Sequence, residues 1–486
     1  MSGLLVMKFG GTSMGSAERI KQAASICADA GSKRPLVVVV SAMSKITDLL
    51  LDTLRAAEMG RSVDVETNLK QLEQRHVETC RSLLTSTACS AAICEVGILV
   101  GEFQRIAHGM LMLGERPPRS VDEAIATGER LASMMIAAHL TCHGIASEAV
   151  NAAEVIVTDT DFGNANPLMD ETREKARARL LPVLERGAIP IVTGFNGATE
   201  DGRPTTLGRG GSDFSASILA SVLDAEELWI WSDVDGIMTA DPRLVPDAAV
   251  LDEVTYNEAA ELAYNGAKVL HPRTLAPLVE KGIPVWSKNS FNLEAAGTRI
   301  VPMAAKAIPG PRAVTSMANV ALVSVDLAKP AVNGTAIMGR ALDALAAAGS
   351  EVLAFSSSSY RQNFCFLIRK DELAPALEQL EGEFALELEH DYLQPIKVDP
   401  EVGLLAVVGE GMQGTPGLAG RIFTAISREN VNIIAIAQGS SELTIVIVVA
   451  RSGLDRAVKA VHAECGLGQM AHASRSIADS LVPGRL

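Results

Sequence analysis

The stretch that most constrains the fold lies near the start of the chain, where a short apolar run meets a pair of glycines. Residues Leu4–Met7 predict a buried strand, and a helical pattern begins near Ser16. Between them the chain reads Lys-Phe-Gly-Gly-Thr-Ser, residues 8–13. Glycines let backbone N–H groups approach phosphate oxygens, and a helix N-terminus favours negative charge. The pattern therefore predicts a phosphate cradle with Lys8 as a mobile charge.

This motif is not a Walker P-loop, because the lysine comes before the glycines. Taken alone, the pair Gly10-Gly11 fits a plain structural turn equally well. The lysine at the strand end and the hydroxyls of Thr12 and Ser13 favour the functional interpretation.

Apolar runs of strand length recur along the first part of the chain, with helical patterns between several of them. The runs are Leu4–Met7, Leu36–Val40, Val155–Thr158, Ile189–Val192, Glu227–Trp231 and Pro284–Lys288. This alternation predicts an α/β fold with a mostly parallel sheet and helices on both faces. Residues 45–145 read as mainly helical, with a loop at the Pro117-Pro118 pair.

The last third of the chain has a different character. Glycines and prolines from Gly297 to Pro311 predict a linker. A weak internal repeat follows, with one unit at about Ala318–Ile368 and the other at about Val402–Val449. Each unit has a strand, a glycine-containing loop, a helix, and then one or two strands. With 486 residues in the chain, two to four domains are expected.

Composition excludes several classes of function. The 43 Lys and Arg residues against 58 Asp and Glu give a net charge of −15. That balance argues against binding to nucleic acid or to an anionic membrane. The seven cysteines include no C-x-x-C pair, which predicts reduced thiols and no metal site. With no leader pattern and no uninterrupted apolar run of about 20 residues, we expect a cytoplasmic protein.

Two segments carry side chains suited to binding an amino acid. The strand Leu36–Val40 ends at Ser41-Ala42-Met43-Ser44-Lys45-Ile46-Thr47, and small hydroxyls there can hydrogen-bond a carboxylate. Helix capping is an equally good account of any one of them. Glu129 opens a helical pattern, where a carboxylate usually just complements the helix dipole.

The densest cluster is Gly208-Arg209-Gly210-Gly211-Ser212-Asp213, which comes before an apolar helical run. Arg209 can grip a carboxylate with a two-pronged geometry that lysine lacks. A plain turn does not need an arginine, a serine and an aspartate among three glycines, so the cluster favours a binding function.

The motif at residues 8–13 resembles the signature of aspartokinases, within the amino-acid kinase family, and later segments fit the same family over nearly the whole chain. The resemblance implies an amino-acid-kinase-type catalytic domain at residues 1–300, an α/β fold with a mostly parallel sheet sandwiched by helices. It implies two α+β, ferredoxin-like ACT domains after it, at residues 313–395 and 400–475. The implied activity is ATP-dependent phosphorylation of the side-chain carboxylate of L-aspartate to 4-phospho-L-aspartate.

The resemblance also implies roles for individual residues. The expected catalytic residues are Lys8, Asp213 and Lys268. The expected aspartate-binding residues are Ser41, Thr47, Glu129, Arg209, Gly210 and Ser212. The expected ATP-binding residues are Lys8, Gly10, Gly11, Thr12, Ser13, Ser232, Asp233, Met238, Arg243 and Lys268. Many relatives have tyrosine where this chain has Met238. Mg²⁺ is expected mainly on the ATP phosphates, with no closed metal cage, and His271 is expected to be structural.

Feedback regulation and self-association are the further expectations from the ACT-like units. The stretch after Val431 resembles an effector-site segment, with Asn432, Ile433 and Gln438 expected to bind threonine or lysine. In the first unit Ser356 replaces the glutamine and Tyr360 replaces the glutamate. The other interpretation is that both segments are only scaffold. A homodimer or larger homo-oligomer is expected, because isolated ACT units leave sheet edges open.

Two rival functions remain open from the sequence. One is a kinase of the same family for another acceptor, such as glutamate, acetylglutamate, carbamate or uridylate. The other is a catalytically inactive amino-acid sensor. The length predicts no fused homoserine dehydrogenase.

Overall fold

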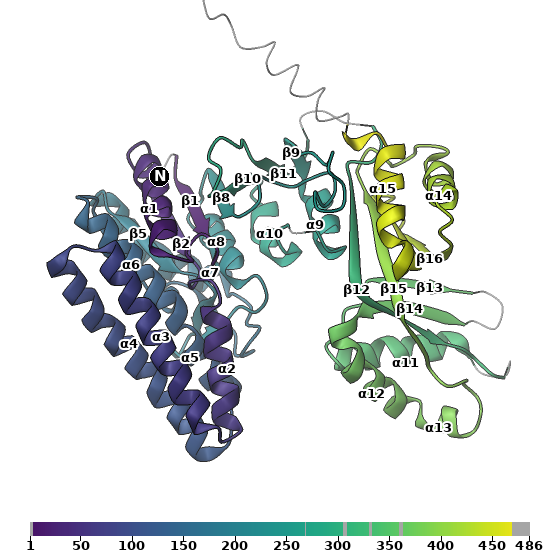
Figure 1. The fold of residues 1–486 in the computed structure, drawn as a ribbon, viewed down its shortest axis with the longest axis horizontal. Coiled ribbons are helices and arrows are strands. Elements are labelled where there is room, and N and C mark those ends of the chain that lie inside the picture. Colours follow the sequence, from purple (N-terminus) through teal and green to yellow (C-terminus); the bar gives the residue numbers. More distant parts are fainter. Residues whose placement is uncertain (1–2, 268, 305–308, 330–332, 359–362, 469–486) are drawn as a thin grey trace, which may run out of the picture. The chain divides into compact units, whose positions relative to one another are not determined.

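The computed structural model describes residues 3–267, 269–304, 309–329, 333–358 and 363–468. The chain divides into two compact units (Figure 1). The first comprises residues 1–237, 252–256 and 270–303, and the second comprises residues 238–251, 257–269 and 304–486.

The first unit is built on an eight-stranded sheet in the order β3-β5-β2-β1-β8-β10-β11-β9. Its strands are β1 Leu5–Phe9, β2 Leu36–Val40, β3 Ser147–Val150, β5 Ile189–Thr193, β8 Glu227–Ser232, β9 Glu253–Thr255, β10 Val285–Asn289 and β11 Thr298–Val301. β1 is parallel to β2 and β8, β5 is parallel to β2 and β3, and β10 is parallel to β8. The carboxyl ends of these strands therefore meet at one edge of the sheet. A small second sheet holds β4 Val157–Thr158, β6 Asn196–Thr199 and β7 Pro204–Thr206.

Helices pack on the sheet, as the alternating pattern predicted. α1 and α6 contact β2, whereas α8 contacts β1, β2 and β8 and also α7 and α10. α2, α3, α4 and α5 form a further helical group against α1 and α6. The helices of this unit are α1 Ala17–Gly31, α2 Ile46–Glu58, α3 Ser62–Leu83, α4 Ser86–Leu113, α5 Pro118–Ile125, α6 Thr127–Cys142, α7 Met169–Glu185, α8 Gly211–Val222 and α10 Pro272–Val279. The predicted break falls between α4 and α5, where Pro118 is the first residue of α5.

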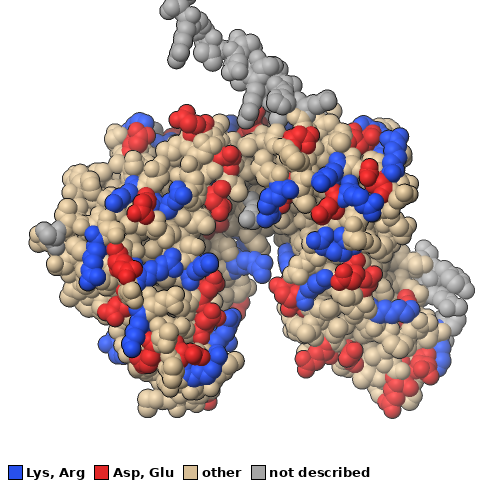
Figure 2. Space-filling model, viewed as in Figure 1, with Lys and Arg blue, Asp and Glu red and all other residues tan. Residues whose placement is uncertain are grey.

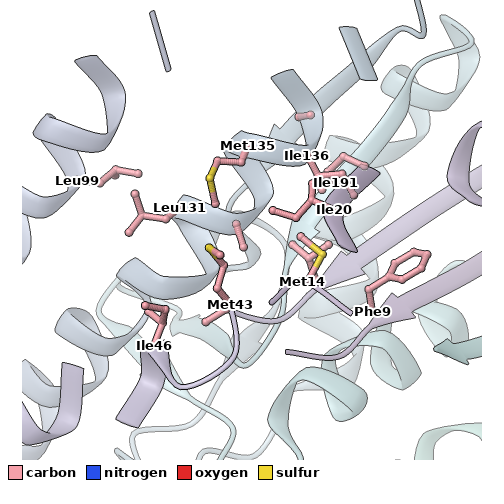
Figure 3. Close-up of a cluster of buried hydrophobic side chains, with 14 of the residues drawn as sticks. Phe9, Met14, Ile20, Met43, Ile46, Leu99, Leu131, Met135, Ile136 and Ile191 are labelled. Carbon is pink, nitrogen blue, oxygen red and sulfur yellow. The ribbon is translucent and has the colours of Figure 1, made fainter. Parts of the chain in front are cut away.

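The core of the first unit explains how β1 can be buried and still carry a reactive lysine. Leu5, Met7 and Phe9 belong to a hydrophobic cluster that also includes side chains of α1, α2 and α6. Figure 3 shows Phe9 and Met14 near Ile20, and Met43 and Ile46 near Leu131. Because successive side chains of a strand point to opposite faces, Lys8 points away from this cluster.

Within α4, residues Thr87–Leu113 are long and apolar enough to cross a membrane by length and composition alone. One face of this helix, including Val96, Phe103 and Met110, packs into the core of the first unit. A single such helix is weak evidence for a membrane span.

The second unit is built on a six-stranded antiparallel sheet in the order β13-β14-β12-β15-β17-β16. Its strands are β12 Ala313–Val325, β13 Ala354–Ser357, β14 Phe364–Arg369, β15 Lys397–Val408, β16 Ile433–Gln438 and β17 Thr444–Ala450. Its helices are α11 Gly334–Ala347, α12 Leu373–Glu383, α13 Ala385–Glu389, α14 Leu418–Arg428 and α15 Leu454–Glu464, together with most of α9 Tyr256–Tyr264.

The predicted internal repeat is present as β12-α11-β13-β14 and β15-α14-β16-β17. The two repeats interlock, because β12 and β15 pair with each other along nearly their whole length. The first part of β12, Ala313–Met317, pairs with Leu404–Val408, and the later part, Val320–Val325, pairs with β14.

Two expectations about elements were wrong. Residues Thr298–Val301 are not linker but strand β11, which pairs with β10 and β9, and Thr298, Ile300 and Val301 are buried. Residues Val155–Thr158 contribute only β4, which belongs to the small sheet. The edge of the large sheet is formed instead by β3, a strand too short and too polar to stand out in the sequence.

Candidate active site

A cleft of about 540 Å³ lies in the first unit, beyond the carboxyl ends of β1, β2 and β5. The N-terminus of α8 and a side chain of α6 complete it. It brings together nine of the residues predicted from the sequence: Lys8, Gly11, Ser41, Thr47, Glu129, Arg209, Gly210, Ser212 and Asp213.

The centre of the cleft is an ion pair between Lys8 on β1 and Asp213 on α8. The Lys8 Nζ atom lies 2.6 Å from Asp213 Oδ1. The two side chains are only 10% and 21% exposed, so water screens the pair weakly. Asp213 therefore holds the lysine ammonium in one place at the end of β1.

The glycine pair allows the chain after β1 to pass close to the loop after β2. A Cβ atom on Gly11 would lie 3.2 Å from the Ala42 carbonyl oxygen, and one on Gly10 would lie 3.5 Å from Lys8 Nζ. Thr12 is exposed, whereas Ser13 is buried with its hydroxyl 2.7 Å from that of Ser290. The side chain of Ser13 thus fastens this loop to the end of β10.

Glu129 is a buried carboxyl group aimed into the cleft. Its Oε1 atom accepts a hydrogen bond from the Ala42 backbone N–H at 3.1 Å, and its Oε2 atom has no partner among the described residues. Burial raises the pKa of Glu129 to about 8. The neighbouring Gly128 permits this position, because a Cβ there would lie 2.8 Å from that of Ala42. A buried carboxyl with one open oxygen is suited to receive an ammonium group.

The loop before α8 presents Arg209 beside a helix N-terminus. Gly208 and Gly210 have φ angles of +73° and +71°, a left-handed conformation that favours glycine. Arg209 is exposed and has no ion-pair or hydrogen-bond partner within the described part of the chain. With the free N–H groups of the first turn of α8, its guanidinium forms an anion-binding surface.

The cleft also contains residues that sequence reasoning missed, among them Lys45 and Phe195. Both have left-handed backbone conformations, with φ angles of +64° and +73°. Such strain in non-glycine residues is concentrated at functional sites. The charge of Lys45 was a visible signal, whereas nothing in the local sequence marked Phe195.

Of the residues expected to bind nucleotide, Lys8 and Gly11 line this cleft, whereas Ser232, Asp233, Met238 and Arg243 do not. Ser232 is the last residue of β8 and Asp233 follows it, and the Ser232 carbonyl accepts a hydrogen bond from Ser290 N–H at 3.0 Å. Met238 and Arg243 belong to the second unit, where Arg243 pairs with Asp241 at 2.6 Å. Lys268 lies outside the described residues.

Of the expected effector residues, Gln438 borders two cavities of the second unit, of about 460 and 210 Å³. Asn432 and Ile433 line neither of them. The larger cavity also contacts Leu353 and Phe355 of the first repeat and Glu261 of α9. Ser356 is part of β13, and Tyr360 lies outside the described residues.

Comparison with known proteins identifies the family. The amino acid kinase family model matches residues 3–289, and an ACT domain model matches residues 405–465. Chloroplastic aspartokinase 3 of Arabidopsis thaliana is 31% identical over 94% of this chain and 80% of its own length. The chain belongs to the aspartokinases of the amino acid kinase family. The predicted fold class, a mostly parallel α/β sheet with helices followed by an ACT region, is thereby confirmed.

Other aspartokinases differ in length or in what they bind. The bifunctional aspartokinase/homoserine dehydrogenase 1 of A. thaliana is 34% identical over 99% of this chain but only 53% of its own length. The chain thus spans about half the length of the bifunctional relatives it matches. Escherichia coli aspartokinase III in complex with aspartate and ADP superimposes with a TM-score of 0.81, at 27% identity over 95% of this chain and 99% of that one. The same enzyme with lysine and aspartate gives 0.77, at 28% identity and the same coverage.

Proposed function

We propose that this protein is an aspartate 4-kinase, which transfers the γ-phosphoryl group of ATP to the side-chain carboxylate of L-aspartate and gives ADP and 4-phospho-L-aspartate. The observation that carries the proposal is the cleft in which a partnerless guanidinium, a buried open carboxylate and a fixed lysine meet. The guanidinium, the carboxylate and the lysine have charges opposite to those of the α-carboxylate, the ammonium group and the side-chain carboxylate of aspartate.

In this proposal two residues hold the α-substituents of aspartate. Arg209 grips the α-carboxylate with its two-pronged guanidinium, and Glu129 Oε2 receives the ammonium group. The hydroxyls of Ser41, Thr47 and Ser212 supply further polar contacts in the cleft. The side-chain carboxylate is then left to face Lys8. It is already ionised near neutral pH, so no general base is needed to create the nucleophile.

Phosphoryl transfer in this site depends on positioning and charge. Lys8 stabilises the negative charge that spreads over the transferring phosphoryl group, and Asp213 keeps the ammonium of Lys8 aimed at it. The Gly10 N–H already donates to the Trp231 carbonyl oxygen at 3.1 Å, so the backbone N–H groups from Gly11 onward receive the phosphate oxygens. Because the Ser13 hydroxyl is hydrogen-bonded to that of Ser290, Ser13 contributes only its backbone to the phosphate site.

The rest of the nucleotide site is proposed from the resemblance. Ser232, Asp233, Met238 and Arg243 contact the nucleotide, and Lys268 supplies a second charge on the phosphates. The described residues contain no group of three His, Cys, Asp or Glu side chains that could hold a metal ion. In this proposal Mg²⁺ therefore arrives bound to the ATP phosphates and does not need a closed site made of protein side chains. The ion would neutralise phosphate charge when bound.

The location and regulation of the enzyme belong to the same proposal. A cytoplasmic location stays a prediction, since several relatives are chloroplastic enzymes. An amino-acid effector, threonine or lysine, binds in the second unit next to Gln438. Among the described residues, the larger cavity there is lined by two carboxylates, Glu261 and Glu351, and by no lysine or arginine. That lining suits an ammonium-bearing zwitterion better than a phosphate.

The decisive experiment measures ADP release from the purified protein with ATP, Mg²⁺ and one acceptor at a time. The acceptors are L-aspartate, L-glutamate, N-acetylglutamate, carbamate and uridylate, and hydroxylamine traps the acyl phosphate from the first. Turnover with aspartate alone is expected. Turnover with another acceptor assigns a sibling activity, and a folded protein that releases no ADP with any of them is a sensor and not a kinase.

A variant of Arg209 tests the orientation of the substrate. Arg209→Lys keeps the charge but loses the fork, so KM for aspartate should rise while KM for ATP changes little. The reverse pattern would move Arg209 to the nucleotide.

A further inference from the structure

A second arginine, Arg273 at the start of α10, contacts the segment that leads into the Arg209 loop. Its Nη1 atom donates to the Leu207 carbonyl oxygen at 3.2 Å, one residue before Gly208. Its guanidinium also lies over the ring of Phe214 in α8, 4.9 Å from the ring centroid. Arg273 therefore touches the chain on both sides of the loop Gly208–Asp213.

The same guanidinium also holds the loop Asn164–Asn166. Its Nη2 atom donates to the Ala165 carbonyl oxygen and to Asn166 Oδ1, both at 2.8 Å. Nη1 donates to Asn164 Oδ1 at 2.5 Å. Asn164 lies directly against Gly208, where an added Cβ would be 2.6 Å from its Oδ1 atom. One planar fork thus satisfies several acceptors that a lysine ammonium could not reach together.

A buried carboxylate ties these segments together from the other side. Asp122 on α5 is 1% exposed and accepts from the backbone N–H groups of Gly163 and Thr206, at 2.8 and 2.9 Å. It also accepts from Thr206 Oγ1 at 2.8 Å. Ala165 N–H donates to the Thr206 carbonyl oxygen at 2.9 Å. The end of strand β7 is therefore held by Asp122 on one side and by Ala165 on the other, just before the chain continues into the Arg209 loop.

The helix that carries Arg273 packs on the loop as well. A Cβ atom on Gly210 would lie 3.3 Å from that of His271 and 3.6 Å from Thr274 Oγ1. His271 Nδ1 accepts a hydrogen bond from Arg273 N–H at 3.3 Å and so caps α10. The backbone around Arg209 has little freedom to shift.

We infer that Arg273 is a positioning residue for the substrate carboxylate, which acts by holding the Arg209 loop and does not touch the substrate itself. The cleft lining includes Gly208, Arg209 and Gly210 but not Arg273. This inference rests on the proposed function, because it assigns the consequence of the clamp to aspartate binding.

Kinetics of Arg273→Ala and Arg273→Lys test the inference. A displacement of about 1 Å in a binding group can cost as much as a hundredfold, so we expect KM for aspartate to rise about tenfold or more in both variants. KM for ATP should stay within about twofold, since the clamp holds the aspartate side of the site. Arg203→Ala is the matched control, because Arg203 lies in the β6–β7 hairpin, which leads into the Arg209 loop, but pairs with Asp201 at the surface. It should leave both constants unchanged.

A double variant separates positioning from simple structural support. If Arg273 acts through Arg209, then Arg209→Ala with Arg273→Ala should have nearly the same KM for aspartate as Arg209→Ala alone. Additive losses would overturn the inference. So would equal increases in KM for aspartate and ATP, or a lowered melting temperature with both constants unchanged.

Hydrogen exchange gives a readout that does not depend on the activity. The amides of residues 207–213 should exchange faster in Arg273→Ala than in the wild type, and no faster in Arg203→Ala. Unchanged exchange would overturn the clamp even if the wild type phosphorylates aspartate. Absence of turnover by the wild type would instead refute the proposed function, with the exchange result still decisive for the clamp.

Discussion

At the scale of single residues, the cleft is organised by ionisable groups that are held in position before any substrate arrives. Lys8 is balanced by Asp213, and Glu129 is buried with one oxygen open. A site prepared in this way spends little free energy on reorganisation during the reaction. Its weak point is that each charged group depends on a single partner.

Replacing Lys8 should remove most of the catalysis. We expect Lys8→Ala to lower kcat by about two orders of magnitude or more, the usual cost of a lost electrostatic contact to the transition state. Lys33→Ala is the control, because Lys33 forms an exposed pair with Asp29. Steady-state assays on folded protein check this, and a near-normal kcat for Lys8→Ala would remove Lys8 from the mechanism.

The pKa of Glu129 makes aspartate binding depend on pH. Burial raises this pKa from 4.5 to about 8, so the empty site is mostly protonated at pH 7, and binding an ammonium group favours the ionised form. KM for aspartate should therefore fall by up to about tenfold per unit as pH rises from 6 to 8, and then level off. Glu129→Gln should have a high KM that does not change over this range. A wild-type KM that is flat from pH 6 to 9 would contradict the assigned role.

Residue chemistry was the part of the site that the sequence predicted best. Lys8 and Arg209 were predicted because a charged residue beside glycines favours a binding site, whereas the role of Glu129 was implied by the resemblance to aspartokinases. Phe195 and Arg273 were not found, because a left-handed φ angle and a contact between distant loops leave no mark on neighbouring residues. Lys45 was missed although its charge was visible in the sequence. The hydrogen bond between Ser13 and Ser290 likewise depends on the register of β10, which no local pattern encodes.

At the scale of elements, the buried strands and the long helices were predicted because their apolar patterns are strong. β3 and β11 were missed because each has only four residues, which is too short for a clear apolar pattern. Gly128 shows the same limit, since it was not singled out and its role lies in the close approach of α6 to the loop after β2.

Helix α3 carries a buried histidine that should make the first unit sensitive to acid. Burial lowers the pKa of His76 from 6.5 to about 4, although its Nδ1 atom is 2.7 Å from the Leu72 carbonyl oxygen. The folded state favours the neutral ring, so this contribution is complete above pH 6.5 and is lost as pH falls towards 4. We expect about 2 kcal/mol less unfolding free energy at pH 5 than at pH 7 from this group.

Denaturant titrations of the wild type and His76→Leu at both pH values test this expectation. The variant should lose less stability on acidification than the wild type. His108→Leu is the control, because His108 is 38% exposed in α4 and pairs with Glu66. Equal losses for all three proteins would show that the acid sensitivity has another source.

At the scale of the whole molecule, neither charge sign dominates the visible surface (Figure 2). Figure 2 shows acidic and basic side chains interspersed over the visible face of both units. The lining of the cleft is mixed as well, with Lys8, Lys45 and Arg209 beside Asp48, Glu129 and Asp213. The domain limits 1–300, 313–395 and 400–475 stay predictions, and the interlocked strands β12 and β15 could not be deduced from the repeat.

Strand β16 offers a surface for self-association. It ends the order of the six-stranded sheet, and its alternate residues Ile434 and Ile436 are 40% and 41% exposed. Apolar edge strands favour pairing with another chain, so we expect a homodimer or larger assembly by light scattering at micromolar concentration. Ile436→Lys should shift it towards monomer, whereas Ile98→Lys, at a 51% exposed site in α4, should not. A fully active wild-type monomer would contradict this.

Feedback regulation should depend on the second repeat, and the reason lies in the difference between the two repeats. Gln438 borders both cavities of the second unit and offers an amide donor and acceptor to an amino acid, whereas Ser356 has only a hydroxyl. We therefore expect threonine or lysine to inhibit, and Gln438→Ala to desensitise the enzyme with its uninhibited kcat nearly unchanged. Ser356→Gln should strengthen inhibition by a single amino acid.

Titration of activity with threonine and lysine, singly and combined, measures these effects. Glu442 gives a second check from within the same segment, because its Oε2 atom accepts from Gly414 N–H at 2.7 Å and so closes the smaller cavity. Glu442→Ala should weaken inhibition as Gln438→Ala does if the effector occupies that cavity, and should leave it intact if the larger cavity is used. If the wild type ignores both amino acids at millimolar levels, alone and together, the regulatory proposal fails and the paired repeats are left as an assembly device.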